Sequence, residues 1–392
     1  MTVQFSRRVL AAAVALFAAL PGWGCGVAHA QQQPIRVGAF VAATGGASFL
    51  GAPELNTLRL YVDRINRAGG VLGRPLQLSI YDSAGDARQA VTFVRRLIEE
   101  DRVDFIVGGS TTGETMAVLP LIAEAQVPFI SLAGANVVVT PVAERRWVFK
   151  TPHSDTMAVQ KIFEDMKRDN LTRAAVLGGP GGFDQSCRAE AQRLAPQYGI
   201  QVVMDETYGA NDTDMTPQLT RIRNGQNVQA IVGCGFGAPT VITARNYRQL
   251  GMQSIRFYFN HGVGSPQFIE QSGGAAEGIR VPVAALLVAD QLPENDPQRA
   301  AALEYQQVYR AAFNEPISTF GGHAYDALMI ALDAVRRAGG TDRARVRDEI
   351  ERTTNFAGVD GIFNITPQDH MGLDLRSFRM VEIRNNAWRL LY

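Results

Sequence analysis

The sequence predicts an α/β protein with two lobes, each built on a doubly wound parallel β-sheet. From residue 35 onward, short runs rich in β-branched and aromatic residues alternate with amphipathic helical patterns. Strands that alternate with helices usually pair in parallel and place helices on both faces of the sheet. The alternation forms two successive series, and the roughly 360 residues after position 30 exceed what one hydrophobic core usually serves. Two cores are therefore expected.

The first series fills residues 35–150. Its expected strands cover 35–41, 76–81, 105–107 and 129–131, and its expected helices cover 54–68, 87–99 and 114–125. The helix at 54–68 stops before Gly69 and Gly70, and glycine is the commonest residue just after a helix. The first lobe should therefore hold four parallel strands in this part of the chain.

The second series starts after Lys150 and repeats the pattern. Its expected strands cover 174–177, 201–206, 230–232 and 256–259, and its expected helices cover 185–195, 215–223 and 239–250. The remainder is mostly helical, with helices expected at 298–313, 322–338 and 343–351 and strand patterns at 361–365 and 378–383. Helices without interleaved strands cannot build a third α/β domain, so they should cover a sheet already formed.

These patterns also predict where the lobes begin and end. We expect the chain to cross between lobes near residues 150, 285 and 358, and we expect the three crossings to act as a hinge. Lobe 1 then consists of residues 34–150 plus 286–358, and lobe 2 consists of residues 151–285 plus 359–392.

The first thirty residues are typical of a signal peptide. Arg7 and Arg8 form a charged start, residues 9–20 form an apolar run too short to span a bilayer, and Ala28-His-Ala30 is a small-residue cleavage site. Export by the general or the twin-arginine route and lipidation at Cys25 remain open. The mature chain shows no later run of about 18 apolar residues, so we expect a soluble protein in the periplasm or outside the cell.

Composition excludes several kinds of partner. The formal net charge is +0 at pH 7, and no basic block occurs, which argues against nucleic acid and anionic membranes as partners. Five histidines and the two mature cysteines show no metal-ligand spacing, so neither a metal nor a cofactor is expected. Cys187 and Cys234 can pair in an oxidising compartment or remain buried thiols, and the sequence does not decide between these states.

Two expected strands run directly into loops of small residues. One is the segment 104–113, which ends in glycines and hydroxyls, and the other is 127–136, which ends in Ala133-Gly-Ala135. In parallel sheets, ligands bind at the carboxyl ends of the strands, where loop amides and helix N-termini favour negative charge. These loops therefore predict a pocket for a carboxylate.

Several short motifs, each weak alone, together resemble the periplasmic binding proteins of the branched-chain amino-acid type. They follow one another along almost the whole mature chain: Ile35-Arg-Val-Gly38 before Thr44-Gly45, Ile65-Asn-Arg-Ala-Gly-Gly-Val-Leu-Gly73, Tyr81-Asp82 before Ala87-Arg-Gln-Ala90, Val107-Gly108 before Thr112-Gly113, Ala276-Glu-Gly278, and Ala324-Tyr-Asp-Ala327. The resemblance implies two α/β lobes joined by three crossovers that close over a ligand. It also implies a monomer that delivers the ligand to an inner-membrane ABC permease.

Carried over by position, the resemblance also implies a set of ligand-binding residues. Thr112 and the loop Ala133, Gly134 and Ala135 would hold the carboxylate on the first lobe, together with Leu50 and Phe49. Phe183 and Phe236 would close from the second lobe.

The departures from the family pattern point to the kind of ligand. His261 stands where amino-acid-binding members usually carry an acidic residue for the ligand's ammonium, Ala135 stands where a hydroxyl is common, and Phe183 and Phe236 stand where Tyr is frequent. An ammonium left unpaired in a dry site costs several kcal/mol. We therefore expect a carboxylate without an α-amino group, such as an aromatic acid or a 2-oxo acid.

Other interpretations of the same residues remain open at this stage. Phe183 and Phe236 can be core residues, Thr112 can simply cap a helix, and His261 can lie outside the pocket. Binding of a hydrophobic amino acid, or a ligand sensor of the same fold, are alternative functions.

An enzyme is the remaining rival. The glycines at 233–238 imitate a dinucleotide fingerprint without the ribose-binding acid, and His153-Ser-Asp155 cannot assemble a catalytic triad from adjacent residues. No catalytic set is therefore proposed, and Ser154 should instead cap a helix.

Overall fold

The computed structural model describes residues 33–225 and 227–392, and the segment Pro34–Tyr392 forms one compact unit. The predicted signal peptide at 1–30 lies outside the described residues. Two large sheets organise this unit, which confirms the predicted α/β class. Within the described part of the chain, no helix combines the length and apolar character needed to span a membrane.

The first sheet is parallel throughout and has the strand order β2-β1-β3-β4-β5. Its strands are β1 (Ile35–Val41), β2 (Leu76–Asp82), β3 (Phe105–Gly108), β4 (Phe129–Ser131) and β5 (Val148–Lys150). Alternate residues of β1 enter different clusters, because successive side chains of a strand point to opposite faces. Val37 and Ala39 join one hydrophobic cluster, and Phe40 joins the other.

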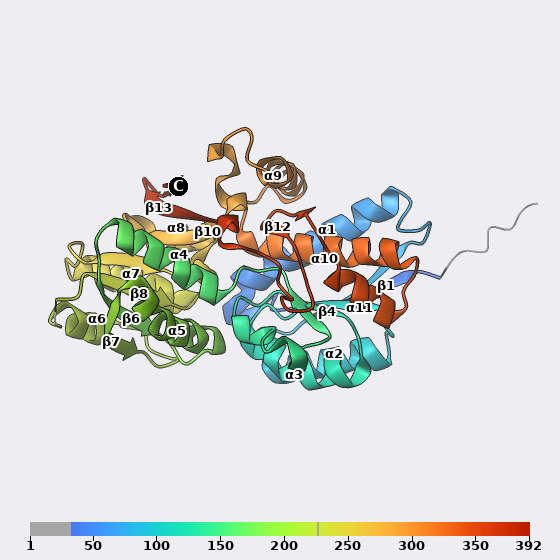
Figure 1. Cartoon of the computed structure of the whole chain (residues 1–392), viewed down its shortest axis with the longest axis horizontal. Helices are drawn as coiled ribbons and strands as arrows, with labels where there is room; N and C mark the ends of the chain where they lie inside the picture. Colours follow the sequence, from blue (N-terminus) through green and yellow to red (C-terminus); the bar gives the residue numbers. More distant parts are fainter. Residues whose placement is uncertain (1–32, 226) are drawn as a thin grey trace, which may run out of the picture. The chain divides into compact units, whose positions relative to one another are not determined.

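Helices cover both faces of the first sheet (Figure 1). On one face lie α2 (Ala87–Glu99) and α3 (Thr112–Ala125). On the other face, α1 (Ser48–Arg67) and α10 (Thr319–Ala338) contact the strands, and α9 (Arg299–Phe313) and α11 (Arg343–Glu351) add side chains to the same cluster. The late helices therefore cover a sheet already formed, as the sequence predicted.

The second sheet has the strand order β14-β13-β10-β9-β8-β6-β7 among the described residues. Its strands are β6 (Arg173–Gly178), β7 (Gln201–Thr207), β8 (Ala230–Cys234), β9 (Arg256–Phe259), β10 (Arg280–Ala284), β13 (Phe378–Arg384) and β14 (Ala387–Leu390). The last two strands pair antiparallel, and the others pair in parallel. One face is covered by α4 (Asp155–Arg168) and α5 (Gly182–Leu194), and the other by α6 (Thr216–Arg223), α7 (Ala238–Gln249) and α8 (Pro266–Ser272).

Some elements differ from the expectation. The strand expected at 361–365 is reduced to β12 (Ile362–Phe363), which pairs only with β11 (Phe356–Ala357). Helix α1 begins at Ser48 instead of residue 54, so Phe49 and Leu50 lie in its first turn and not in a loop. Pro53 sits inside this helix, and a proline is tolerated best near a helix start, where few amides have a partner to lose.

The segment that follows the expected third crossing near residue 358 packs in part with the first sheet. Five buried side chains between residue 358 and β13 belong to the cluster under that sheet: Val359, Phe363, Ile365, Met371 and Leu373. The reason is the open edge of β5, where the backbone amide of Lys150 donates to the carbonyl of His370, and the His370 ring contacts the carbonyl of Val148. Residues 359–373 therefore pack with the first sheet, and only β13 and β14 join the second.

Candidate ligand-binding site

A cavity lies where the carboxyl ends of strands from both sheets meet. Six of the nine residues predicted for the site line it: Leu50, Thr112, Gly134, Phe183, Phe236 and His261. Sequence reasoning missed the other lining residues, which are Ser110, Thr111, Leu132, Pro152, Gly262, Phe320 and His323. Ser110 and Thr111 directly precede Thr112, so the predicted small-residue loop at 104–113 could have pointed to them. Phe320 and His323 lie on α10, whose return to the first sheet gives no local sequence signal.

The remaining three predicted residues lie beside the cavity. Ala133 is fully buried in the cluster on the α2–α3 face, and Ala135 is buried just before a short 3-10 helix. Phe49 borders a neighbouring cavity and contacts the ring of Phe236, with their centroids 6.0 Å apart. The ring of Phe49 therefore lies between the two cavities.

Thr112 is the first residue of α3, and its hydroxyl is available to a ligand. The helix is capped by its neighbour: Thr111 accepts from the amide of Glu114, whose side chain accepts from the amide of Thr111. Thr112 Oγ1 is buried and has no hydrogen-bond partner among the described residues. The interpretation of Thr112 as a mere cap is therefore wrong, and its hydroxyl is a polar group without a partner in the cavity wall.

Gly134 brings the first-sheet loop against the second sheet. A Cβ atom built on Gly134 would lie 2.8 Å from His261 Nε2 and 2.8 Å from Phe183 Cε2, so only glycine fits this contact. Its carbonyl accepts from Lys150 Nζ at 2.8 Å and from the amide of Asp155 at 3.2 Å. Two residues at the first crossing thus hold this loop in place.

Four phenylalanine rings form a connected aromatic wall. The centroids of Phe183 and Phe236 are 6.1 Å apart, and the ring of Phe49 contacts Phe236 on one side and Phe320 on the other. Phe183 lies in the first turn of α5, and Phe236 lies two residues after β8. The ring faces offer apolar surface to a ligand body.

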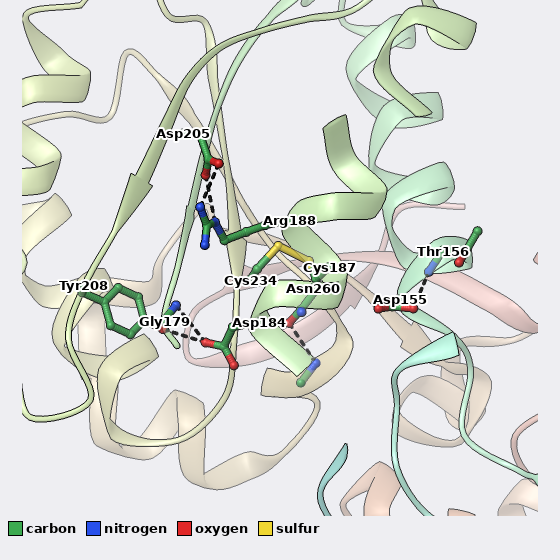
Figure 2. The surroundings of a disulfide bond; sticks show 11 residues. Asp155, Thr156, Gly179, Asp184, Cys187, Arg188, Asp205, Tyr208, Cys234 and Asn260 are labelled. Atoms are coloured by element: carbon green, nitrogen blue, oxygen red, sulfur yellow. Dashed lines mark hydrogen bonds and ion pairs between the residues drawn. A yellow bond between two sulfur atoms is a disulfide. The ribbon is translucent and has the colours of Figure 1, made fainter. Parts of the chain in front are cut away.

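A disulfide links the two elements that carry Phe183 and Phe236. Cys187 of α5 and Cys234 at the end of β8 form the bond, which resolves the question that the sequence left open (Figure 2). Beside it, Asp184 accepts from the amide of Gly179 at 3.0 Å and from Tyr208 at 3.2 Å. The second-sheet part of the cavity wall is therefore braced by covalent and polar contacts.

His261 is the most unusual polar group in the cavity wall. It lies directly after β9 and Asn260, is buried, and has no hydrogen-bond partner on either ring nitrogen among the described residues. Burial lowers its pKa well below the ordinary value, and the nearby basic groups His153, Lys150 and His323 act in the same direction. The ring is therefore neutral at pH 7 and offers one donor and one acceptor.

The other basic groups around the cavity also hold their protons less tightly than usual. Burial lowers the pKa of His323 to about 3 and that of Lys150 to about 7. His323 Nδ1 lies 2.7 Å from Asp360 Oδ2, and burial raises the pKa of Asp360 well above its ordinary value, so the pair is held in its neutral form. Among the described residues, no group of three or more His, Cys, Asp or Glu side chains is arranged to hold a metal ion.

Comparison with known proteins decides the family. The sequence matches the family described as periplasmic binding protein over residues 34–387. The chain belongs to this family. The leucine-, isoleucine-, valine-, threonine- and alanine-binding protein of Pseudomonas aeruginosa is 24% identical over 362 residues, which cover 92% of this chain and 91% of the relative.

Solved structures agree with this assignment. Rp1789 of Rhodopseudomonas palustris is 26% identical, with a TM-score of 0.85 over 92% of this chain and 100% of that one. LivJ of Streptococcus pneumoniae, solved in complex with isoleucine, has the same fold at 22% identity, with a TM-score of 0.79 over 92% of this chain and 98% of that one. The protein is thus a type I periplasmic binding protein of the branched-chain amino-acid type, as the motifs predicted. Membership implies a periplasmic location, a small-molecule ligand and an ABC-transporter permease as partner.

Proposed function

We propose that this periplasmic binding protein captures a small carboxylate without an α-amino group, such as an aromatic acid or a 2-oxo acid, by hinge closure and delivers it to its permease. It performs no chemistry on the ligand. The nine residues predicted from the sequence form the proposed binding region, with Ala133 and Ala135 acting through the loop backbone and Phe49 acting as an edge of the aromatic wall.

The observation that carries this proposal is the meeting of two helix N-termini at the cavity. A Cβ atom built on Gly182, the first residue of α5, would lie 3.4 Å from Thr112 Cγ2 and 4.0 Å from the amide nitrogen of Gly113, both in the first turn of α3. Each helix start carries roughly half a positive charge, so the two repel each other. An anion bound beside both would relieve this repulsion and accept from the hydroxyl of Thr112.

The same wall disfavours an amino acid. No Asp or Glu is among the described residues that line the cavity, and the neutral ring of His261 occupies the expected place of an acidic residue. A buried ammonium would therefore lack an anion, which costs several kcal/mol. The neutral ring of His261 supports binding of an oxygen atom instead, because its N–H can donate to a carboxylate or a carbonyl group.

Hydrophobic amino acids remain the second candidate, because the relatives named above bind leucine, isoleucine and valine or were solved with isoleucine. Calorimetric titration with matched pairs separates the two. We expect phenylpyruvate and 4-methyl-2-oxopentanoate to bind. Phenylalanine and leucine, which carry an ammonium group in place of the keto oxygen, should bind at least 100-fold more weakly. Tight binding of leucine or valine without binding of either oxo acid or of benzoate would refute the proposal. Mass spectrometry of any compound that copurifies would identify the ligand directly.

A further inference from the structure

Glu54 is a buried carboxyl group directly behind the cavity wall. It lies on α1, has no exposed surface, and its Oε2 is hydrogen-bonded to Ser110 Oγ, which lines the cavity. Its other oxygen, Oε1, has no hydrogen-bond partner among the described residues. The charged side chain that acts most on its pKa is another acid, Glu114, and no ion pair joins Glu54 to a basic side chain among the described residues.

These surroundings favour the neutral acid. An ionised carboxylate without a cation and with one oxygen unpaired is very costly in a dry interior, and a neighbouring carboxylate adds repulsion. Burial accordingly raises the pKa of Glu54 well above its ordinary value, and Glu114 acts in the same direction. Glu114 itself differs, because its two oxygens accept from Ser83 Oγ and from the amide of Thr111.

The protonation state of Glu54 decides whether the Ser110 hydroxyl faces a ligand as a hydrogen-bond donor or as an acceptor. Ser110 Oγ already accepts from the amide of Ala42 at 2.9 Å. A hydroxyl has two acceptor positions and one proton. If Glu54 is ionised, Ser110 must donate its proton to it and keeps one acceptor position for the ligand. If Glu54 is protonated on Oε2, it donates to Ser110, fills the second acceptor position and leaves the Ser110 proton free.

We infer that Glu54 is a positioning residue which, held as the neutral acid, turns the hydroxyl of Ser110 into a pure hydrogen-bond donor toward the cavity. Ser110 then stands beside the donor group of Thr112 and selects a carboxylate or carbonyl oxygen over an ammonium. This inference deepens the proposed function and rests on it for the ligand class, but the protonation state of Glu54 can be measured independently.

The first experiment is carbon-13 NMR of the full chain carrying glutamate labelled at the side-chain carboxyl carbon, without added ligand. The signal of Glu54 is identified by its loss in Glu54→Gln. We expect the chemical shift of a protonated acid at pH 7, and the shift of an ionised carboxylate would overturn the inference. This result stands even if no acid binds, in which case only the proposed function fails.

The second experiment measures phenylpyruvate binding by calorimetry at pH 7. Glu54→Gln presents the same donor to Ser110 and should bind within about twofold of the unaltered protein, as should the control Glu99→Gln, which changes an exposed residue of α2. Glu54→Leu and Ser110→Ala should each bind phenylpyruvate about tenfold more weakly. In Glu54→Leu the Ser110 hydroxyl is no longer oriented toward the ligand, and in Ser110→Ala the hydroxyl that donates the hydrogen bond is absent. A tenfold gain in Glu54→Gln alone would show that Glu54 is ionised and would overturn the inference. If Glu54→Leu fails to fold, Glu54→Gln and the NMR measurement still decide.

Discussion

Among single residues, His261 is the one we propose to set which charge the site accepts. Its ring is buried, neutral and without a partner, and it contacts Phe183 edge to face with centroids 5.2 Å apart. We expect His261→Glu to weaken phenylpyruvate binding about 100-fold or more, since two anions about 4 Å apart repel by roughly 4 kcal/mol near a protein surface. The same variant should gain affinity for phenylalanine.

His261→Gln is the control for this exchange, because it keeps a donor and an acceptor without a charge. It should retain phenylpyruvate within about tenfold and should not bind phenylalanine. Calorimetry with both compounds provides the measurement. Undiminished phenylpyruvate binding by His261→Glu would place the carboxylate elsewhere in the cavity.

Lys150 links the stability of the protein to pH. Its amine is fully buried, donates to the carbonyls of Gly134 and His153, and has a pKa lowered from 10.5 to about 7. Between pH 7 and 10.5 the unfolded chain therefore binds more protons at this residue than the folded chain, so its contribution to stability rises with pH. The rise is at most about 1.4 kcal/mol per pH unit.

Lys150→Met should lack this rise. Urea unfolding at pH 7, 8 and 9 should show the free energy of unfolding of the unaltered protein increasing relative to the variant. Lys167→Met, which removes an exposed lysine on α4, serves as the control and should track the unaltered protein. Parallel curves for Lys150→Met and the unaltered protein would contradict the prediction.

At the scale of elements, the disulfide joins α5 to β8 across 47 positions of sequence. Closing a loop of this length restricts the unfolded chain, and the expected stabilisation is about 4 kcal/mol. We expect the double variant Cys187→Ala, Cys234→Ala to unfold at a correspondingly lower urea concentration. The unaltered protein unfolded in dithiothreitol should match it. Equal stability with and without reductant would show that the pair does not form.

Local patterns predicted most elements well, because hydrophobic periodicity and caps are local signals. Helix α2 lies where the sequence placed it, at 87–99, and Ser154 caps α4 by accepting from the amide of Met157. The short strand β5 and strand β10 were missed, since a buried strand of three to five residues gives little periodicity.

The residues of the site were also predictable where the signal was local and not where it depended on distant contacts. Thr112, Gly134, Phe183, Phe236 and His261 all lie near strand or helix ends that the sequence marks, and all line the cavity. Phe320 and His323 reach it only because α10 packs against α1, which depends on contacts far apart in the chain. The packing of residues 359–373 on the edge of β5 is another such contact, and local patterns do not reveal it.

At the scale of the whole molecule, Gly134 is where the proposed closure is most sensitive. Its backbone conformation does not require glycine, and the atoms that a Cβ would meet, on His261 and Phe183, both belong to the second-sheet side. An alanine should therefore fit the first lobe alone but obstruct the closed form, and only a difference in affinity between open and closed forms can drive closure.

We expect Gly134→Ala to melt within a few degrees of the unaltered protein, because its clash arises only when the lobes meet. The variant should bind phenylpyruvate 10- to 100-fold more weakly, since a loss of roughly 1.4 kcal/mol in binding free energy corresponds to a tenfold loss of affinity. Small-angle X-ray scattering with saturating phenylpyruvate should show the unaltered protein contracting and the variant staying extended. Gly274→Ala, where a Cβ would meet no atom within 4 Å, is the control and should contract normally. If Gly134→Ala bound with full affinity and contracted, the ligand would have to be held without approach of His261 and Phe183 to this loop, and hinge closure at this contact would be excluded.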